Sequence, residues 1–269
     1  MKLVKIDPPG TWCQNDAILS LIRSTGAQTF VEIGCGGGGL LLKNFEMGFS
    51  GIGIDFSPAA IQIAKGRLKT FLDTGRFQLI QADATKTNHE TAKAEHAQMS
   101  PRSKDLGLSI MVMEHVEDDL GFICNLAALV KTGGHVLVGV PGRRDRWNIE
   151  DETVGHIRRY DREDLATKME SAGLSDVRVI SVAVPVANFL YYVGNLLIRR
   201  SAEVHKKTLS LREQTETSGV RDIPFKTVFP TFFRIFLNRF TMYPLFLLQR
   251  VFYDTELGLT IIGIGRVPK

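Results

Sequence analysis

Val31-Glu32-Ile33-Gly34-Cys35-Gly36-Gly37-Gly38-Gly39 is the stretch that decides the fold of this chain. Residues 29–33 are mostly β-branched or apolar and predict a short buried strand, and Leu40 begins a helical pattern. Glycines between a strand and a helix let a ligand approach bare backbone, because no Cβ stands in the way. The amides at the start of that helix would point at a polar group of the ligand. The stretch therefore predicts a binding site for a nucleotide-type cofactor.

The spacing of the glycines fits more than one cofactor. Gly34, Gly36 and Gly39 satisfy the G-x-G-x-x-G pattern of dinucleotide-binding folds. Gly34, Gly36 and Gly38, preceded by Glu32, equally satisfy an E/D-x-G-x-G-x-G pattern. This second pattern resembles class I S-adenosylmethionine (SAM) methyltransferases. A glycine-rich turn without any ligand is the third interpretation, so the residues that follow must decide.

Four later segments bear on this choice, and three of them favour SAM. Gly51–Asp55 predicts a second strand that ends in an acid, where a ribose diol would lie in both families. Ala82-Asp83-Ala84 follows a third strand, and in SAM methyltransferases an acid at this point receives the adenine amino group. A fourth strand leads into Met113-Glu114-His115-Val116, which resembles the EHV segment of that family. Val130–Val138 resembles its helix–turn–strand segment, so the chain is similar to class I methyltransferases over roughly residues 28–183.

The resemblance implies an α/β fold. We expect a doubly wound, Rossmann-like, mostly parallel seven-stranded sheet with an antiparallel last strand and a helical C-terminal insert. We expect one domain over residues 1–269, with a SAM-binding core at 14–184, a helical insert at 185–256 and the last strand at 257–267.

Local signals place some of the other elements. Residues 1–13 are expected to be irregular, and Asn15 is expected to cap a helix that runs to about residue 25. Ser57-Pro58 predicts the start of a helix, because serine caps well and proline suits the first helical position. Residues 177–184 predict a sixth strand.

The resemblance also implies the contacts of the cofactor. Glu32 and the backbone of Gly34 and Gly36 would hold the methionine moiety of SAM. Asp55 would bind the ribose diol, and Asp83 with Ala84 would bind the adenine. The full set of expected cofactor-binding residues is Glu32, Gly34, Cys35, Gly36, Asp55, Phe56, Asp83, Ala84, Met113 and His115.

The expected catalytic residues are His115, His156 and Tyr160. His115 follows a strand end and suits a general base, because the ordinary pKa of histidine is close to neutral; a plain contact with the cofactor or a neighbouring loop is the alternative. His156 and Tyr160 lie in the segment 151–160, which resembles the GHxRRY signature of a bacterial methyltransferase subgroup. Being four apart, they would project together if that segment were helical.

The expected acceptor-binding residues are Arg143, Arg158 and Arg159, whose guanidinium groups can bind phosphate or carboxylate. No metal is expected: His89 and His96 lie in a polar stretch at 85–104 that predicts a surface loop, without metal-ligand spacing. No nucleic acid is expected either, because the fourth strand is not followed by the N/D-P-P-Y/F segment of nucleic-acid amino-methyltransferases.

The C-terminal insert has two apolar parts. Residues 185–198 end against Arg199-Arg200, and residues 225–253 contain eight of the sixteen phenylalanines but no Asp or Glu. The phenylalanines from Phe225 to Phe240 recur with helical spacing and predict one helix with a single ring face, with Pro230 in its first turn. Neither part has the roughly 20 apolar residues that a membrane span needs. We therefore expect either contact with an anionic membrane surface or packing as a lid or homodimer interface.

Composition adds a weak preference for anionic partners, because the net charge is +4 and the isoelectric point is about 9.0. Three scattered cysteines and no apolar leader predict a cytoplasmic protein, with membrane association as a further expectation. The expected function is SAM-dependent methyl transfer to an amphipathic acceptor such as a lipid, quinone or lipid-linked sugar. The alternative is a soluble small-molecule or natural-product methyltransferase; remoter ones are a nicotinamide-dependent oxidoreductase and a non-catalytic SAM-binding protein.

Overall fold

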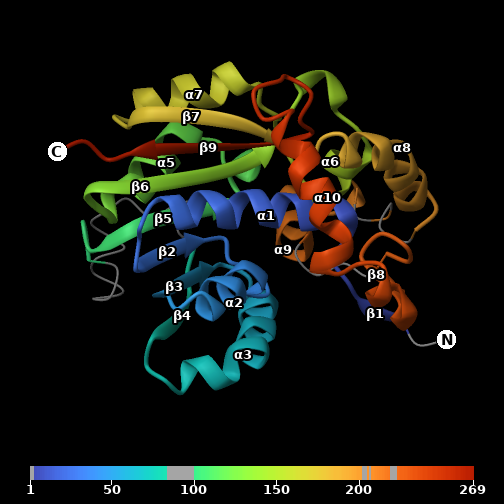
Figure 1. The fold of residues 1–269 in the computed structure, drawn as a ribbon, viewed down its shortest axis with the longest axis horizontal. Helices are drawn as coiled ribbons and strands as arrows, with labels where there is room; N and C mark the ends of the chain where they lie inside the picture. The colour runs from blue at the N-terminus through green and yellow to red at the C-terminus, as the bar shows by residue number, and fades with distance from the viewer. Residues whose placement is uncertain (1–2, 84–99, 202–204, 206, 219–222) are drawn as a thin grey trace. The chain divides into compact units, whose positions relative to one another are not determined.

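The computed structural model describes residues 3–83, 100–201, 205, 207–218 and 223–269. The chain divides into two compact units that interleave along the sequence (Figure 1). The sheet unit comprises Leu21–Val140, Glu163–Val179 and Ile262–Lys269, and the insert unit comprises Met1–Ser20, Pro141–Arg162 and Ile180–Ile261. The expected division into a core at 14–184 and an insert at 185–256 stays a prediction.

Among the described residues, seven strands form one sheet in the order β4-β3-β2-β5-β6-β9-β7 (Figure 1). Their bounds are β2 Thr29–Ile33, β3 Ser50–Asp55, β4 Phe77–Gln81, β5 Lys104–Ile110, β6 Val130–Pro141, β7 Ser175–Val182 and β9 Thr260–Arg266. β2 pairs in parallel with β3 and β5, and β5 pairs in parallel with β6. Gly133 and Val267 are joined by an N–H···O bond of 2.8 Å, and the N–H of Val267 returns to Gly134. The last strand is therefore antiparallel, and the expected fold class is confirmed.

Helices cover both faces of the sheet. The sheet unit contains α2 Gly39–Glu46, α3 Pro58–Leu72, η1 Met113–His115, α5 Asp119–Ala128 and most of α7 Arg162–Ser171. Phe30 on β2 packs against Phe45 of α2, with 6.3 Å between the ring centroids. Leu106 is paired with Phe30, so Gly107 points to the opposite face, where a Cβ would lie 3.0 Å from Leu126 of α5. α2 and α5 thus lie on opposite faces, as a doubly wound sheet requires.

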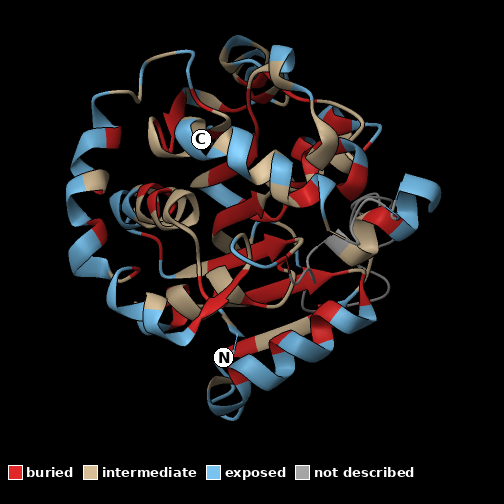
Figure 2. Cartoon of the chain, turned by 90° about the vertical axis from the view of Figure 1, so that its right-hand side faces the viewer, coloured by how far each residue is buried: buried red, intermediate tan, exposed pale blue. Residues whose placement is uncertain are grey.

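The predicted start of α3 is confirmed. The side chain of Ser57 accepts a hydrogen bond from the N–H of Ala60 over 3.3 Å, and Pro58 occupies the first helical position. Figure 2 shows buried residues along the strands and exposed residues on the outward faces of helices.

The insert unit contains mostly helices. Its elements are β1 Leu3–Lys5, most of α1 Pro9–Ser24, η2 Arg144–Arg146, α6 Ile149–Val154, α8 Val186–Arg199, α9 Leu211–Ser218, β8 Val228–Pro230, η4 Thr231–Ile235 and α10 Arg239–Arg250. β1 and β8 form an antiparallel pair. A small core lies among these elements: Ile6, Cys13, Ala183, Phe229, Leu237, Met242 and Phe246.

The expected start of the first helix is wrong. α1 begins at Pro9, and Asn15 lies inside it, where its side chain donates to Asp7 over 3.3 Å. Proline suits the first turn because its missing N–H would have no partner there. Residues 3–5 are likewise a strand rather than an irregular lead-in, because β8 supplies their hydrogen-bond partners.

The expected single helix of phenylalanines is also wrong. Pro230 ends β8 instead of starting a helix, and Asn238 caps the separate helix α10 through bonds from the N–H groups of Phe240 and Thr241. Phe229 is buried in the core, whereas Phe232 is exposed, so the rings do not share one face. The strand pairing with β1, distant in sequence, overrides the local periodicity.

Two other expectations concern length and placement. Among the described residues, no helix is long and apolar enough to cross a bilayer. Most of the expected surface loop at 85–104, with His89 and His96, lies outside the described residues.

Candidate active site

Only glycine fits the first position of the glycine loop. Gly34 has φ +76°, and a Cβ there would lie 2.1 Å from Cγ2 of Val112. The N–H groups of Gly34 and Cys35 both donate to the carbonyl of Ile54, over 2.8 and 3.0 Å. The loop therefore turns sharply at the end of β2 and is tied to β3.

Asp55 is oriented by two backbone amides. Its Oδ2 accepts from the N–H of Gly36 over 2.8 Å, and its Oδ1 accepts from the N–H of Ser57 over 2.9 Å. Burial raises the pKa of Asp55, and these two hydrogen bonds oppose that rise. A carboxylate held in this way keeps lone pairs for further donors, such as the hydroxyls of a ribose. No described atom would lie within 4 Å of a Cβ on Gly36, so space is open beside it.

Glu32 lies one residue before the end of β2 and is 3% exposed. Its Oε2 accepts no hydrogen bond from the described residues. Burial raises the pKa of Glu32 to about 8, and the nearby charge of Asp55 adds to the rise. A buried carboxyl with an unused oxygen suits a ligand that brings a positive charge, as the amino group of SAM does.

The remaining expected cofactor residues also belong to the sheet unit. Cys35 is buried, and burial raises the pKa of its thiol, so the thiol is unreactive and only the backbone is available. Phe56 follows β3, Asp83 follows β4, and all three side chains of η1 follow β5. Asp83, Phe56 and His115 are half-buried, whereas Met113 is fully buried. Ala84 lies outside the described residues. These positions share the carboxyl edge of the parallel strands, where ligands bind in such sheets.

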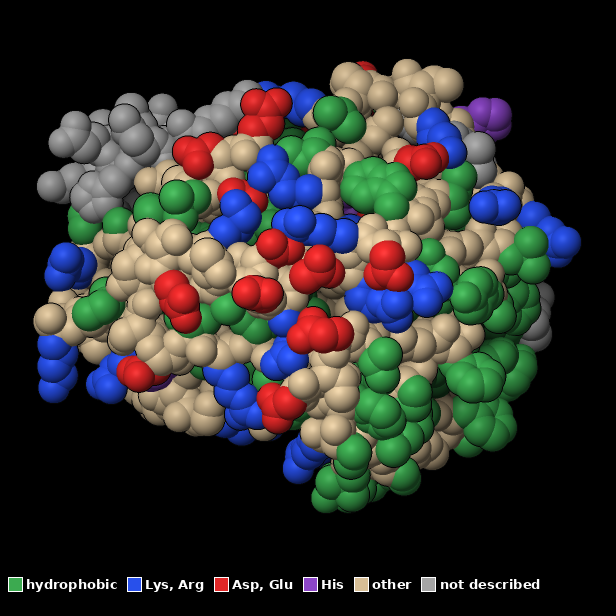
Figure 3. All heavy atoms as spheres, turned by 90° about the horizontal axis from the view of Figure 1, so that it is seen from above, with side chains coloured by type: hydrophobic (Ala, Val, Ile, Leu, Met, Phe, Trp, Pro, Cys, Tyr) green, Lys and Arg blue, Asp and Glu red, His purple; other side chains and the backbone are tan. Residues whose placement is uncertain are grey.

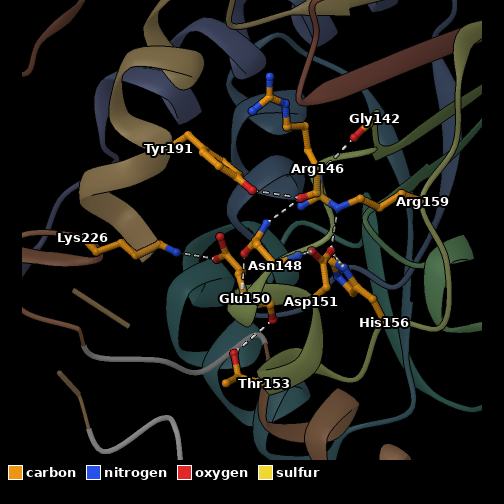
Figure 4. Close-up of polar contacts among 10 residues, drawn as sticks. All are labelled: Gly142, Arg146, Asn148, Glu150, Asp151, Thr153, His156, Arg159, Tyr191 and Lys226. Carbon is orange, nitrogen blue, oxygen red and sulfur yellow. Dashed lines mark hydrogen bonds and ion pairs between the residues drawn. The ribbon is translucent and has the colours of Figure 1, made fainter. Parts of the chain in front are cut away.

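A second group of polar residues lies in the insert unit, between the end of β6 and α7 (Figure 4). Asp151 is fully buried, and its Oδ1 accepts from Nδ1 of His156 over 2.7 Å and from Nε of Arg159 over 2.9 Å. Its Oδ2 accepts from the N–H of Asn148 over 2.8 Å. Burial disfavours ionisation of Asp151, but the bonds from His156 and Arg159 outweigh burial and hold its pKa below the usual range.

Arg159 is buried, and its guanidinium group binds other residues of the protein. Besides its bond to Asp151, its Nη1 donates to the carbonyl of Gly142 over 2.9 Å, and its side chain is 7% exposed. Arg143 binds Asp145 with two hydrogen bonds, of 3.1 and 2.8 Å. Arg158 is half-buried. Two of the three arginines expected to bind an acceptor are therefore engaged by aspartates.

The expected helical relation of His156 and Tyr160 is wrong. Gly155 ends α6 with φ +79°, and residues 156–159 form no helix. Tyr160 is 1% exposed, and its N–H donates to the carbonyl of Pro141. Because ionised Asp151 can only accept, Nδ1 is the nitrogen of His156 that donates to it. The Asp151 carboxylate thus fixes the orientation of the His156 ring.

Sequence reasoning did not single out Asp151 as the centre of this group. A usable signal was present, because Asn148 and Asp151 stand three apart and form a reciprocal capping box at the start of α6. The contacts of Tyr191 and Lys226 with this segment carried no local signal. Tyr191 donates to the carbonyl of Arg146 over 3.1 Å, and Lys226 binds Glu150 over 2.6 Å (Figure 4).

The glycine loop, the buried Glu32 and the oriented Asp55 on this sheet define a class I SAM-dependent methyltransferase. The chain belongs to this family: the model of a methyltransferase domain matches residues 11–179. The family match sets aside the dinucleotide interpretation of the glycine loop, and the cofactor is SAM.

Several known proteins are similar to this chain. The ubiquinone biosynthesis O-methyltransferase of Nitrosomonas europaea is 32% identical over 126 residues, which cover 47% of this chain and 49% of that protein. The protein of that name from Vibrio vulnificus strain YJ016 is 34% identical over 48% of this chain and 50% of its own length. The chain thus matches about half the length of these curated relatives. The structure of Haemonchus contortus phosphoethanolamine N-methyltransferase 2 in complex with SAM has a TM-score of 0.56 at 18% identity and covers 95% of this chain and 52% of that one. At that identity the likeness shows the fold alone.

Proposed function

We propose that this protein transfers the methyl group of SAM to an amphipathic acceptor of the quinone, lipid or lipid-linked sugar type. The observation that carries the acceptor class is the exposed apolar surface of the insert unit, where Phe189 is 85% and Phe240 is 88% exposed. Soluble proteins rarely expose large apolar patches without a partner for them. The names of the curated relatives support a quinone-like acceptor among these choices.

SAM supplies an activated methyl group, so the protein must position donor and acceptor and remove the acceptor's proton. On the donor side, Glu32 binds the amino group of the methionine moiety, and the amides of Gly34 and Gly36 approach its polar atoms. Asp55 accepts the ribose hydroxyls. Asp83 with Ala84 binds the adenine. Cys35 contributes backbone, and Phe56, Met113 and His115 line the same site.

His156 is the residue that we favour as the general base. Its Nδ1 is held by Asp151 over 2.7 Å, which fixes the direction of the ring and stabilises the imidazolium that forms when the ring takes a proton. Its side chain is 12% exposed, which shields the transferred proton from bulk water. His115, half-buried in η1, is the second candidate. Tyr160 is too buried to share this role without movement and instead positions the segment.

On the acceptor side, we propose that an anionic group of the acceptor meets the segment that carries Arg143, Arg158 and Arg159. Arg143 would have to leave Asp145, and Arg159 would have to leave Asp151, before either could bind an acceptor as a fork. Arg159 therefore acts as a positioning residue that ties Asp151 to the end of β6.

A chain-length series tests the acceptor class. Catechols that carry no, a short or a long prenyl chain are compared at equal concentration in detergent, with SAM labelled in its methyl group. The proposal predicts that kcat/KM rises with chain length, because the chain adds apolar contact. A rate that is highest for the acceptor without a chain would favour the alternative, a soluble small-molecule methyltransferase whose insert forms a lid or a homodimer interface.

A further inference from the structure

Helix α8 exposes one apolar stripe and buries the other side. Its exposed residues recur at helical spacing: Phe189, Tyr192, Val193 and Leu196 are 85%, 68%, 53% and 46% exposed. Val186 and Ala187, in the first turn of the helix, pack against the small core of the insert unit, and Ile198 near its end is fully buried. The helix therefore has no need of this stripe for its own folding.

Helix α10 and the turn η4 show the same division. Met242 and Phe246 of α10 belong to the core that α8 packs against. The exposed large hydrophobic residues of η4, of the turn after it, of α10 and of the C-cap of α10 are Phe232, Ile235, Phe236, Phe240, Tyr243, Leu247, Leu248 and Val251. In Figure 3 hydrophobic side chains gather at the lower right, the side on which Figure 1 draws α8 and α10. We call the exposed residues of α8, η4 and α10 together the apolar face.

The charges beside the apolar face are positive. Residues 186–200 and 225–253 contain no Asp or Glu. Arg199 and Arg200 end α8, and Arg234 and Arg239 stand among the exposed rings; all four are exposed. No ion pair of these arginines occurs among the described residues. An apolar surface with an uncompensated basic rim matches an interface of acyl chains and anionic headgroups.

We infer that the apolar face docks on the surface of an anionic lipid bilayer. A second copy of this chain is a poorer occupant, because a two-fold symmetric contact would bring the same unpaired arginines of both copies together. Among the described helices none is long and apolar enough to cross a bilayer. We therefore infer that α8 and α10 lie on the bilayer surface. This inference goes beyond the proposed methyl transfer and does not depend on it.

The docked elements also hold the polar segment around Asp151. Tyr191, on the inner side of α8, donates to the carbonyl of Arg146 over 3.1 Å. Lys226, next to Phe225, binds Glu150 of α6 over 2.6 Å (Figure 4). Asn188 of α8 donates to the carbonyl of Leu257 over 2.8 Å. Docking of α8 would therefore fix residues 146–151 relative to the lipid surface.

Sedimentation with vesicles tests the docking without any methyl acceptor. The protein, residues 1–269, is mixed with vesicles of phosphatidylcholine alone or of phosphatidylcholine with phosphatidylglycerol. We expect sedimentation with the anionic vesicles, little with the neutral ones, and weakening by raised salt. Arg234→Gln with Arg239→Gln should weaken the binding roughly thirtyfold, because each basic side chain near such a surface contributes about fivefold.

Apolar variants separate the lipid surface from a second copy. Phe189→Ser and Phe240→Ser each remove a strongly exposed ring. Each should weaken vesicle binding by about tenfold or more, because the free energy gained by burying that ring in the bilayer is lost. Leu120→Ser, at a 39% exposed position on α5 of the sheet unit, is the matched control and should leave binding unchanged. If the wild type ignores anionic vesicles, or elutes as a salt-insensitive dimer that Phe240→Ser dissociates, the inference is wrong. Calorimetry with SAM then shows separately whether the cofactor site is intact.

Discussion

The backbone N–H of Gly36 donates to Oδ2 of Asp55 over 2.8 Å, so the glycine loop orients the acid that follows the neighbouring strand. The other oxygen of Asp55 is held by the N–H of Ser57 over 2.9 Å. The acid that we propose for the ribose of SAM is therefore oriented by the backbone of the fold itself. A preorganised acid needs little further ordering when a ribose binds, which favours affinity.

Asp55→Asn should weaken binding of SAM and of S-adenosylhomocysteine by roughly 1–3 kcal/mol, the usual contribution of a hydrogen bond to a charged group. Asparagine keeps one oxygen for the loop amides but lacks the second acceptor. Isothermal titration calorimetry measures the change. Asp73→Asn, at an exposed position after α3, is the control and should bind as the wild type does. Equal affinity of the Asp55→Asn variant would remove Asp55 from the cofactor site.

Two glycines in one loop should respond differently to alanine. Gly34→Ala adds a Cβ 2.1 Å from Val112 at φ +76°, and we expect a loss in the free energy of unfolding on the order of 2–4 kcal/mol. Gly36→Ala should lower the free energy of unfolding only by the backbone strain, on the order of 1–2 kcal/mol, because no described atom lies within 4 Å of the added Cβ. The methyl group would instead narrow the open space beside Asp55. Urea unfolding and SAM titration distinguish the two; similar stability losses would show that the clash with Val112 relaxes.

Glu32 should make the stability depend on pH. Its pKa is about 8 in the folded protein and 4.5 ordinarily, so the folded state holds a proton that the unfolded chain has released between these values. The free energy of unfolding should therefore fall as the pH rises from about 4.5 to about 8. Glu32→Gln removes the titration and should flatten this part of the profile. A profile that is the same in both proteins would show that Glu32 does not carry the proton.

His156→Ala should lower turnover by about a hundredfold or more while SAM affinity stays nearly intact, since it removes a proton acceptor and not a cofactor contact. His115→Ala is the companion variant, with the same change of side chain in the sheet unit. Single-turnover rates and SAM titration of both variants decide between the two bases. Loss of SAM binding in parallel with turnover would mark the residue as a contact of the cofactor.

The cofactor loop and most of the sheet were predictable because their signals are local. A strand, a glycine turn and a helix follow one another within the stretch around Gly34, and the capping of α3 lies within Ser57-Pro58. The insert was not predictable in the same way. Phe229 lies in β8, whose partner strand β1 comes more than two hundred residues earlier. The spacing of the phenylalanines does not indicate that pairing.

The contacts of the residues expected to bind the acceptor were also not predictable from the sequence. The sequence drew attention to Arg159 and His156, but both owe their positions to the buried carboxylate of Asp151. An arginine that binds an aspartate and one that awaits a substrate look alike in a sequence. Only the contacts distinguish them, and they assign Arg159 to holding the fold.

Transfer of the labelled methyl group into a lipid-soluble product is the direct test of methyl transfer to an amphipathic acceptor. The purified protein is incubated with SAM labelled in its methyl group and anionic vesicles that contain a long-chain prenyl catechol, and the products are separated into lipid and aqueous fractions. We expect labelled methyl ether in the lipid fraction, in equal amount to S-adenosylhomocysteine, and a strong reduction with Asp55→Asn. No label in the lipid fraction, while a water-soluble catechol without a chain is methylated readily under the same conditions, would show that the acceptor is not amphipathic.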